Sequence, residues 1–257
     1  MKKVYLLLTL LLSMMSATAS FQPATATEFS HAKFDTLLKR HVADGKVNYK
    51  ALKQDKLLDE YLSDLSRANP NALGSRDEKI AFWINAYNAY TLKLIVDNYP
   101  LKSIKDLSFL GTIVINSPWK KEFCNIGGKL YSLDAIEHDI LRGEFGEEKI
   151  HFAVNCASES CPILRNEAYS PSKLKAQLEE QARTFLGDGV RNQMRWEGKT
   201  LYLSQIFNWY RGDFEKKSGS LEAYLAQFFT DEQKRWLAAG EVKIEFLDYD
   251  WSLNEQP

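Results

Sequence analysis

Cysteine is scarce in this chain, with three residues among 257, and none belongs to a Cys-x-x-Cys pair. Structural zinc sites usually carry ligands at such short spacings, so we predict no metal site and no other cofactor. Positive charge is not concentrated either, because the net charge is −1 and no basic cluster follows the first residues. Nucleic acids and anionic membranes bind basic surfaces, and we therefore exclude both as partners.

Long apolar runs are also lacking, except for one near the N-terminus. Lys2 and Lys3 precede an apolar stretch over residues 4–15, and small residues follow it. This order is typical of a secretory signal, whereas a membrane anchor needs about 20 apolar residues. We predict that residues 1–26 are a signal, cleaved after Ala19 or Ala26. The mature protein would then be periplasmic or secreted, with no membrane attachment.

Aromatic residues are abundant, with 6 Trp, 12 Tyr and 14 Phe, and most apolar patterns have a helical period. The best-defined helix covers residues 76–98, with a capping box formed by Ser75 and Glu78 and apolar residues on nearly all sides. A helix without a polar face is normally buried. The sequence therefore predicts an α+β fold: a mainly helical single domain over residues 27–257, with a small, mostly antiparallel sheet packed on this buried central helix.

Polar side chains are densest between residues 150 and 162. The alternation of apolar residues over 150–155 predicts a strand, and a loop of small residues follows it. Functional loops often lie at the ends of strands. Our candidates in this segment are an amide, two thiols and two hydroxyls, at Asn155, Cys156, Ser158, Ser160 and Cys161.

Three segments together resemble the domain of unknown function 547 family: residues 82–89 (FWINAYNA), 132–142 (SLDAIEHDILR) and 150–162 (IHFAVNCASESCP). Residues 45–49 (GKVNY) are similar to its upstream element, so the resemblance spans about residues 30 to 215. It implies a one-domain protein and supplies no activity. Ala157 stands where the family pattern has glycine, which implies a slightly different backbone geometry in the loop.

Cys156 and Cys161 have two interpretations. In an oxidising compartment the pair is expected to form a disulfide that fixes the loop. Alternatively, one of them is a nucleophile activated by His138 or His151. Cys124 is either buried and inert or a member of the bonded pair, since sequence does not choose among pairings.

His138 shares a predicted helix face with Asp134 and Arg142. This arrangement is either a surface charge ladder or a general base oriented by Asp134, with Arg142 holding an anion. The family resemblance at Glu137, His138 and Arg142 favours a binding or catalytic role. His151 is either a structural residue or a catalyst that shares a cleft with the loop at 155–161, which carries Cys156 and Cys161 and is called the cysteine loop below.

Asn85 and Asn88 lie one turn apart on the predicted central helix. A buried amide without hydrogen-bond partners costs about 1–3 kcal/mol, so both must bond to a neighbouring loop or to a ligand. We expect them to hold the loop at 155–161 against the helix.

Two functions fit these residues. The first is a non-catalytic module that binds an unidentified extracytoplasmic ligand or protein in a polar cleft between the central helix, the 132–142 helix and the 150–162 segment. The second is a hydrolase or acyl-transferase with a Cys–His or Ser–His pair drawn from Cys156, Ser158, Ser160, His138 and His151. We favour the binding module and leave enzymatic activity open.

Overall fold

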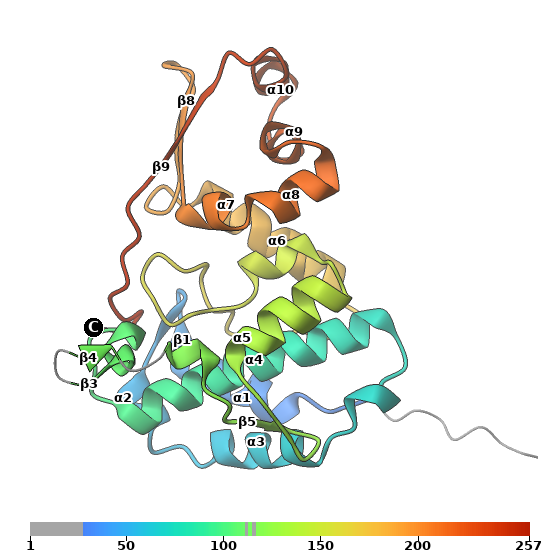
Figure 1. Cartoon of the computed structure of the whole chain (residues 1–257), viewed down its shortest axis with the longest axis vertical. Coiled ribbons are helices and arrows are strands. Elements are labelled where there is room, and N and C mark those ends of the chain that lie inside the picture. The colour runs from blue at the N-terminus through green and yellow to red at the C-terminus, as the bar shows by residue number, and fades with distance from the viewer. Residues whose placement is uncertain (1–27, 111–112, 115–116) are drawn as a thin grey trace, which may run out of the picture.

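The computed structural model describes residues 28–110, 113–114 and 117–257, and the predicted signal at 1–26 lies outside this range. Figure 1 shows two groups of elements: the N-terminal two thirds of the chain around α4 (Arg76–Asn98), and the C-terminal third above them. The prediction of a mainly helical α+β fold is confirmed. Among the described residues, no helix is both long and apolar enough to cross a bilayer.

The elements of the first group precede or surround α4. They are α1 (Ala32–His41), β1 (Val42–Ala43), β2 (Lys46–Val47), α2 (Tyr49–Leu52), α3 (Leu57–Arg67), η1 (Pro70–Ala72), η2 (Ile104–Ser108), β3 (Phe109–Leu110), β4 (Ile113–Val114), η3 (Pro118–Lys120), β5 (Cys124–Ile126), β6 (Lys129–Tyr131), α5 (Leu133–Ala135), the π-helix η4 (Ile136–Glu144) and the 3-10 helix η5 (Glu148–Phe152).

The elements of the second group follow a loop that starts at residue 153. They are α6 (Leu174–Gly187), β7 (Gln193–Arg195), β8 (Thr200–Leu203), α7 (Gln205–Trp209), α8 (Arg211–Ser218), α9 (Leu221–Ala226), α10 (Asp231–Ala238) and β9 (Lys243–Phe246). The chain then returns to the first group, where its C-terminus lies (Figure 1).

Helix α4 is the centre of the first group. Ser75 caps it by accepting a hydrogen bond from the Glu78 N–H, and 16 of its residues are buried, as the apolar pattern predicted. Its apolar side chains belong to one hydrophobic cluster together with those of α1, α3 and the β5–β6 hairpin. A second cluster lies under α6 to α9 and includes Phe152.

The paired strands are antiparallel except for β8 and β9, which run parallel. The largest sheet has the order β7-β8-β9, and its apolar side chains contribute to the second cluster. The β5–β6 hairpin packs with α4 instead, and the Tyr90 hydroxyl donates a 2.6 Å hydrogen bond to the Asn125 carbonyl. A small antiparallel sheet therefore does pack on the central helix.

The strand predicted over residues 150–155 is wrong. Residues 148–152 form η5, and the N–H groups of Ala153 and Val154 both bond to the Ile150 carbonyl. Several further backbone groups of this segment bond side-chain amides instead of a neighbouring strand. Gln181 Nε2 donates to the Phe152 carbonyl at 3.0 Å, and the Asn88 side chain bonds the Ala153 carbonyl and the Asn155 N–H. Alternation in a short, fully buried segment did not distinguish a strand from a 3-10 turn.

The two amides of α4 each hold a distant backbone segment by a pair of hydrogen bonds. Asn88 Nδ2 donates to the Ala153 carbonyl at 2.9 Å, and its Oδ1 accepts from the Asn155 N–H at 2.8 Å. Asn85 makes the same two-point contact with the backbone of Tyr169, at 2.8 and 2.9 Å. Asn88 therefore fixes the start of the cysteine loop, and Asn85 fixes the approach to α6.

We predict that Asn88→Ala lowers the free energy of unfolding by about 2–4 kcal/mol, because it leaves the Ala153 carbonyl and the Asn155 N–H buried without partners. Guanidinium denaturation followed by tryptophan fluorescence would measure the change. Asn98→Ala is the matched control, since Asn98 is exposed at the end of the same helix and its side chain donates to the Leu94 carbonyl one turn earlier. Its expected effect is below about 0.5 kcal/mol, and similar losses in both variants would contradict the prediction.

Candidate functional site

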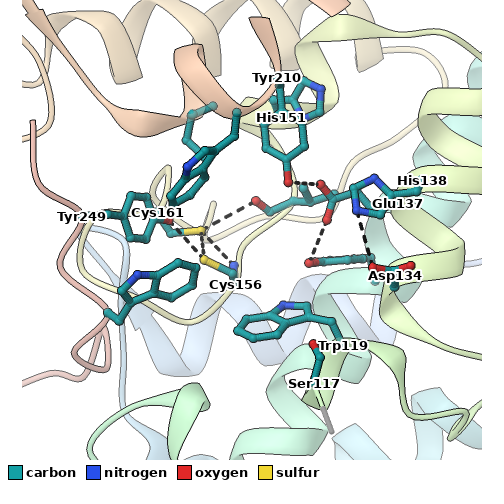
Figure 2. A pocket seen from close by; sticks show the side chains of 15 residues that line it. Ser117, Trp119, Asp134, Glu137, His138, His151, Cys156, Cys161, Tyr210 and Tyr249 are labelled. Carbon is teal, nitrogen blue, oxygen red and sulfur yellow. Dashed lines mark hydrogen bonds and ion pairs between the residues drawn. The ribbon is translucent and has the colours of Figure 1, made fainter. Parts of the chain in front are cut away.

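A pocket of about 220 Å³ opens where the first group of elements meets the second (Figure 2). Its side chains come from α4, η3, α5, η4, η5, the cysteine loop, α7 and the C-terminal segment after β9. Six lining residues are aromatic: Tyr87, Trp119, Trp209, Tyr210, Tyr249 and Trp251. The others include Ser117, Asp134, Glu137, His138, His151, Cys156 and Cys161.

One wall of the pocket is aromatic. The Tyr249 ring lies 4.5 Å from the Trp251 ring and 4.8 Å from the Trp209 ring, measured between centroids. Trp119 contacts Trp251 edge-on at 5.8 Å. Trp209 is 47% exposed, which is unusual for so large an apolar side chain. An exposed aromatic patch beside a pocket is typical of a surface that binds a ligand or another protein.

Glu137 is buried between two tyrosines at the opposite side. The Tyr210 hydroxyl donates to Oε1 at 2.6 Å, and the Tyr87 hydroxyl donates to Oε2 at 3.2 Å. Burial, reinforced by the Glu137 charge, raises the pKa of both tyrosines far above the usual value. Both phenols therefore stay neutral donors at physiological pH, and they supply the hydrogen bonds that a buried carboxylate requires.

His138 lies on η4 between Asp134 and Arg142, as the sequence spacing predicted. Arg142 Nη1 donates to His138 Nδ1 at 2.6 Å, and His138 Nε2 lies 3.6 Å from Asp134 Oδ1. Because Arg142 has only donors, Nδ1 is the acceptor nitrogen and Nε2 is the one that carries the proton in the neutral ring. The ring therefore presents its N–H toward Asp134 at the pocket edge.

Arg142 continues this chain of charges to Asp213 and His151. Its Nε and Nη2 donate to the two Asp213 oxygens at 2.6 and 3.1 Å. His151 Nε2 lies 2.7 Å from Asp213 Oδ2, and its ring stacks on Tyr210 at 3.8 Å. Asp213 was not among our candidates, because nothing in the sequence links α8 to residues 142 and 151.

The pKa values of Asp213 and His151 follow from their burial and from the charges beside them. Hydrogen bonds from His151 and Arg142 hold the pKa of Asp213 well below its usual range, although partial burial opposes them. Burial lowers the pKa of His151 despite the Asp213 carboxylate beside it. His151 is therefore neutral at pH 7 and donates through Nε2, and its Nδ1 has no partner within the described part of the chain.

The two cysteines of the loop face each other. The structure has both as thiols, with 2.7 Å between Cys156 Sγ and Cys161 Sγ, which is longer than the S–S bond of about 2.05 Å. Cys156 is half-buried at the pocket, and Cys161 is only 3% exposed. Cys124 is buried in the first hydrophobic cluster, where burial raises its pKa strongly.

Several other predicted site residues support the pocket without lining it. Asn85 and Asn88 bond backbone groups, and Asn155 bonds the Pro162 carbonyl and the Ala157 N–H. Ser160 accepts from the Asp250 N–H. Ser158 is buried beside Cys156, and Arg142 does not line the pocket but contacts His138 and the ring of Tyr210, which do. Glu137, His138, His151, Cys156 and Cys161 are the predicted residues that line it.

Ala157 has a φ of 61°. This left-handed conformation costs a non-glycine residue about 1–2 kcal/mol. The loop therefore adopts a geometry that suits glycine even though this chain carries alanine. Among the described residues, no group of three or more His, Cys, Asp or Glu is arranged to hold a metal ion.

We predict that Asp213→Asn lowers the free energy of unfolding at pH 7 by about 2 kcal/mol, because Arg142 and His151 lose a charged acceptor. The pKa of Asp213 is depressed by folding, so its stabilising contribution is complete above the unfolded value of about 4 and declines below it. In denaturant titrations the gap between the two proteins should therefore stay constant from pH 7 to about 5 and narrow as the pH falls further to about 3. Asp231→Asn, at a side chain that is 89% exposed, is the control. A constant gap between wild type and Asp213→Asn across this range would contradict the prediction.

Comparison with known families gives one match. Residues 70–186 match the model of the family described as protein of unknown function, DUF547. The match contains the resembling segments at 82–89, 132–142 and 150–162, whereas 45–49 lies before it. No curated protein and no solved structure matches the chain significantly. Residues 70–186, which supply Glu137, His138, His151 and both loop cysteines, thus form a domain that matches the DUF547 family model.

Proposed function

We propose that this protein is a periplasmic or secreted binding module whose pocket takes a small organic cation. The observation that carries the proposal is the composition of the pocket lining. It combines six aromatic side chains with the carboxylates of Asp134 and Glu137, and no Lys or Arg is among the lining residues in the described part of the chain. A concave, largely apolar site with a few convergent polar groups is the usual form of a small-molecule site.

Aromatic rings favour a cation over a neutral or anionic ligand. The electron-rich face of a Trp or Tyr ring attracts a positive charge within about 6 Å of its centroid. Lys105 already occupies one face of Trp251 in this way, with Nζ 4.0 Å from the ring centre. Trp119, Trp209 and Tyr249 line the same wall, and Asp134 supplies negative charge at the pocket edge. An alkylammonium group is the ligand chemistry that suits both features.

The alternative function, a hydrolase or acyl-transferase with a Cys–His pair, has weaker support. The hydrogen bonds of Cys156 Sγ go to Cys161, Ser158 and Tyr249. His138 pairs with Asp134 and Arg142, and His151 pairs with Asp213. Within the described residues, neither imidazole bonds a sulfur or a serine hydroxyl, and activation of a nucleophile by a base requires such contact.

Location and oxidation state belong to the same proposal. The sequence of residues 1–26 has the order of a cleavable signal. An oxidising compartment would join Cys156 to Cys161, whose sulfurs are already in contact, and would leave Cys124 as the free thiol.

We predict saturable quenching of tryptophan fluorescence by choline and by tetramethylammonium. The uncharged isostere of choline, 3,3-dimethylbutan-1-ol, should bind at least about 10-fold more weakly, because it lacks the cation–π attraction. Trp209→Ala should weaken choline binding by about 5- to 30-fold, which corresponds to about 1–2 kcal/mol. The matched control is Trp236→Ala on α10, whose side chain does not line the pocket. Equal affinity for choline and its isostere, or no saturable binding of either cation, would contradict the proposed ligand class.

We also predict the mass of the protein recovered from the periplasm or medium of an expressing bacterium. It should correspond to a chain that begins at residue 20 or residue 27. Alkylation in denaturant without reductant should add one label, at Cys124, and alkylation after reduction should add three. Retention of residues 1–19 would contradict the secretion proposal. Three labels before reduction would contradict the disulfide and leave the secretion proposal intact.

A further inference from the structure

The cysteine pair differs from an ordinary structural disulfide in its position and surroundings. Cys156 lines the pocket and is partly accessible, whereas Cys161 lies directly behind it and is buried. Disulfides that exchange in solution need one accessible sulfur that is attacked or attacks, and a second sulfur within reach that resolves the mixed disulfide. The two cysteines meet this requirement from a single short loop.

Hydrogen bonds distinguish the two sulfurs chemically. The Ser158 hydroxyl lies 3.1 Å from Cys156 Sγ and the Tyr249 hydroxyl lies 3.3 Å from it, in addition to the Cys161 sulfur at 2.7 Å. The Cys156 N–H in turn donates to Cys161 Sγ at 2.9 Å. The Cys161 thiol and the Tyr249 hydroxyl can therefore both donate to Cys156 Sγ, and the Ser158 hydroxyl divides its one hydrogen between this sulfur and the Tyr249 oxygen at 3.2 Å. Hydrogen bonds of this kind stabilise a thiolate.

The pKa values of the two thiols differ in the same sense as their hydrogen bonds. Burial disfavours the Cys156 thiolate, but the hydrogen bonds from Cys161, Ser158 and Tyr249 outweigh it and lower the pKa of Cys156. Burial, together with the adjacent Cys156 sulfur, raises the pKa of Cys161 well above its ordinary value. Cys156 is thus the thiol that ionises first, and it is also the one that faces the pocket.

The loop is held in place while the sulfurs change partners. The Glu159 and Ser160 N–H groups donate to the Ser252 and Asp250 carbonyls at 2.8 and 3.1 Å. Arg191 Nε donates to the Cys161 carbonyl at 2.7 Å. The backbone between the two cysteines and at Cys161 is therefore fixed by residues of the second half of the chain, and interconversion of thiol and disulfide needs movement of the sulfurs alone.

We infer that Cys156 and Cys161 form a reactive dithiol–disulfide couple that exchanges with small-molecule disulfides entering the aromatic pocket. The Cys156 thiolate attacks one sulfur of the substrate disulfide, which forms a mixed disulfide and expels the other half as a thiolate. Cys161 then loses its proton to solvent and attacks Cys156 Sγ, which expels the second half. The substrate gains two electrons and leaves as two thiols, and the protein pair loses two electrons and becomes a disulfide.

This inference goes beyond ligand binding and is tested with a neutral probe, so its outcome does not depend on the proposed preference for cations. The purified protein is reduced, freed of reductant and mixed with bis(2-hydroxyethyl) disulfide at pH 7. Samples are quenched in acid, alkylated in denaturant and mapped by mass spectrometry. Cys124 is an internal control in every sample, because it is a buried thiol in the same chain.

In the wild type we expect oxidation of Cys156 and Cys161 to a disulfide, at least about 100-fold faster than any modification of Cys124 and without a retained adduct. Cys161→Ser should keep one 2-mercaptoethanol group on Cys156, because nothing resolves the mixed disulfide. Cys156→Ser should react at least about 100-fold more slowly than the wild type, since the remaining loop thiol is buried.

Two results would each overturn the inference: reaction of wild-type Cys156 no faster than that of Cys124, or stable accumulation of the mixed disulfide in the wild type. The wild-type time course decides by itself if a variant fails to fold, which circular dichroism would reveal. Failure of this experiment would leave choline binding untouched, and failure of choline binding would leave the exchange chemistry untouched.

Discussion

The paired hydrogen bonds of Asn88 to the backbone of Ala153 and Asn155 are the constraint on which the site depends. They join a helix that is buried on nearly every side to the first residues of the cysteine loop. Because α4 is enclosed by the first hydrophobic cluster, it cannot move without disrupting that core. The loop consequently takes its position from the buried central helix of the fold.

Asp213 is the corresponding constraint at the opposite side of the pocket. It accepts hydrogen bonds from Arg142 on η4 and from His151 on η5, although it lies on α8 in the second group of elements. The ring of His151 in turn supports Tyr210, whose hydroxyl bonds Glu137. The partly buried Asp213 carboxylate thus connects the two groups of elements and determines the orientation of several side chains at the pocket. A carboxylate with these partners is a positioning group, because it does not itself line the pocket.

Local signals predicted the helices well. The Ser75 N-cap, the apolar pattern of α4 and the spacing of Asp134, His138 and Arg142 all depend on residues close in sequence, and the structure has each of them. The predicted capping box forms only in its Ser75 half, because the Glu78 side chain accepts from the Gly74 N–H instead of the Ser75 N–H. The segment at 150–155 failed because its backbone partners are amides from distant helices, which no local pattern reveals. Asp213, Tyr249 and Trp251 were not predicted for the same reason. Their contacts with the site depend on how distant parts of the chain fold back against each other.

The pocket combines two kinds of contribution from different parts of the sequence. The thiols, Glu137 and both histidines come from residues 70–186, whereas Trp209, Tyr210, Tyr249 and Trp251 come from residues after that match. Substitutions in the aromatic wall would alter which molecules enter, and most of them would leave the sulfur chemistry unchanged. Tyr249 is the exception, because its ring belongs to the wall and its hydroxyl lies 3.3 Å from Cys156 Sγ. Recognition of a ligand and reactivity of the thiol therefore meet at one side chain, so a ligand that displaces this hydroxyl would also remove a hydrogen bond that stabilises the thiolate.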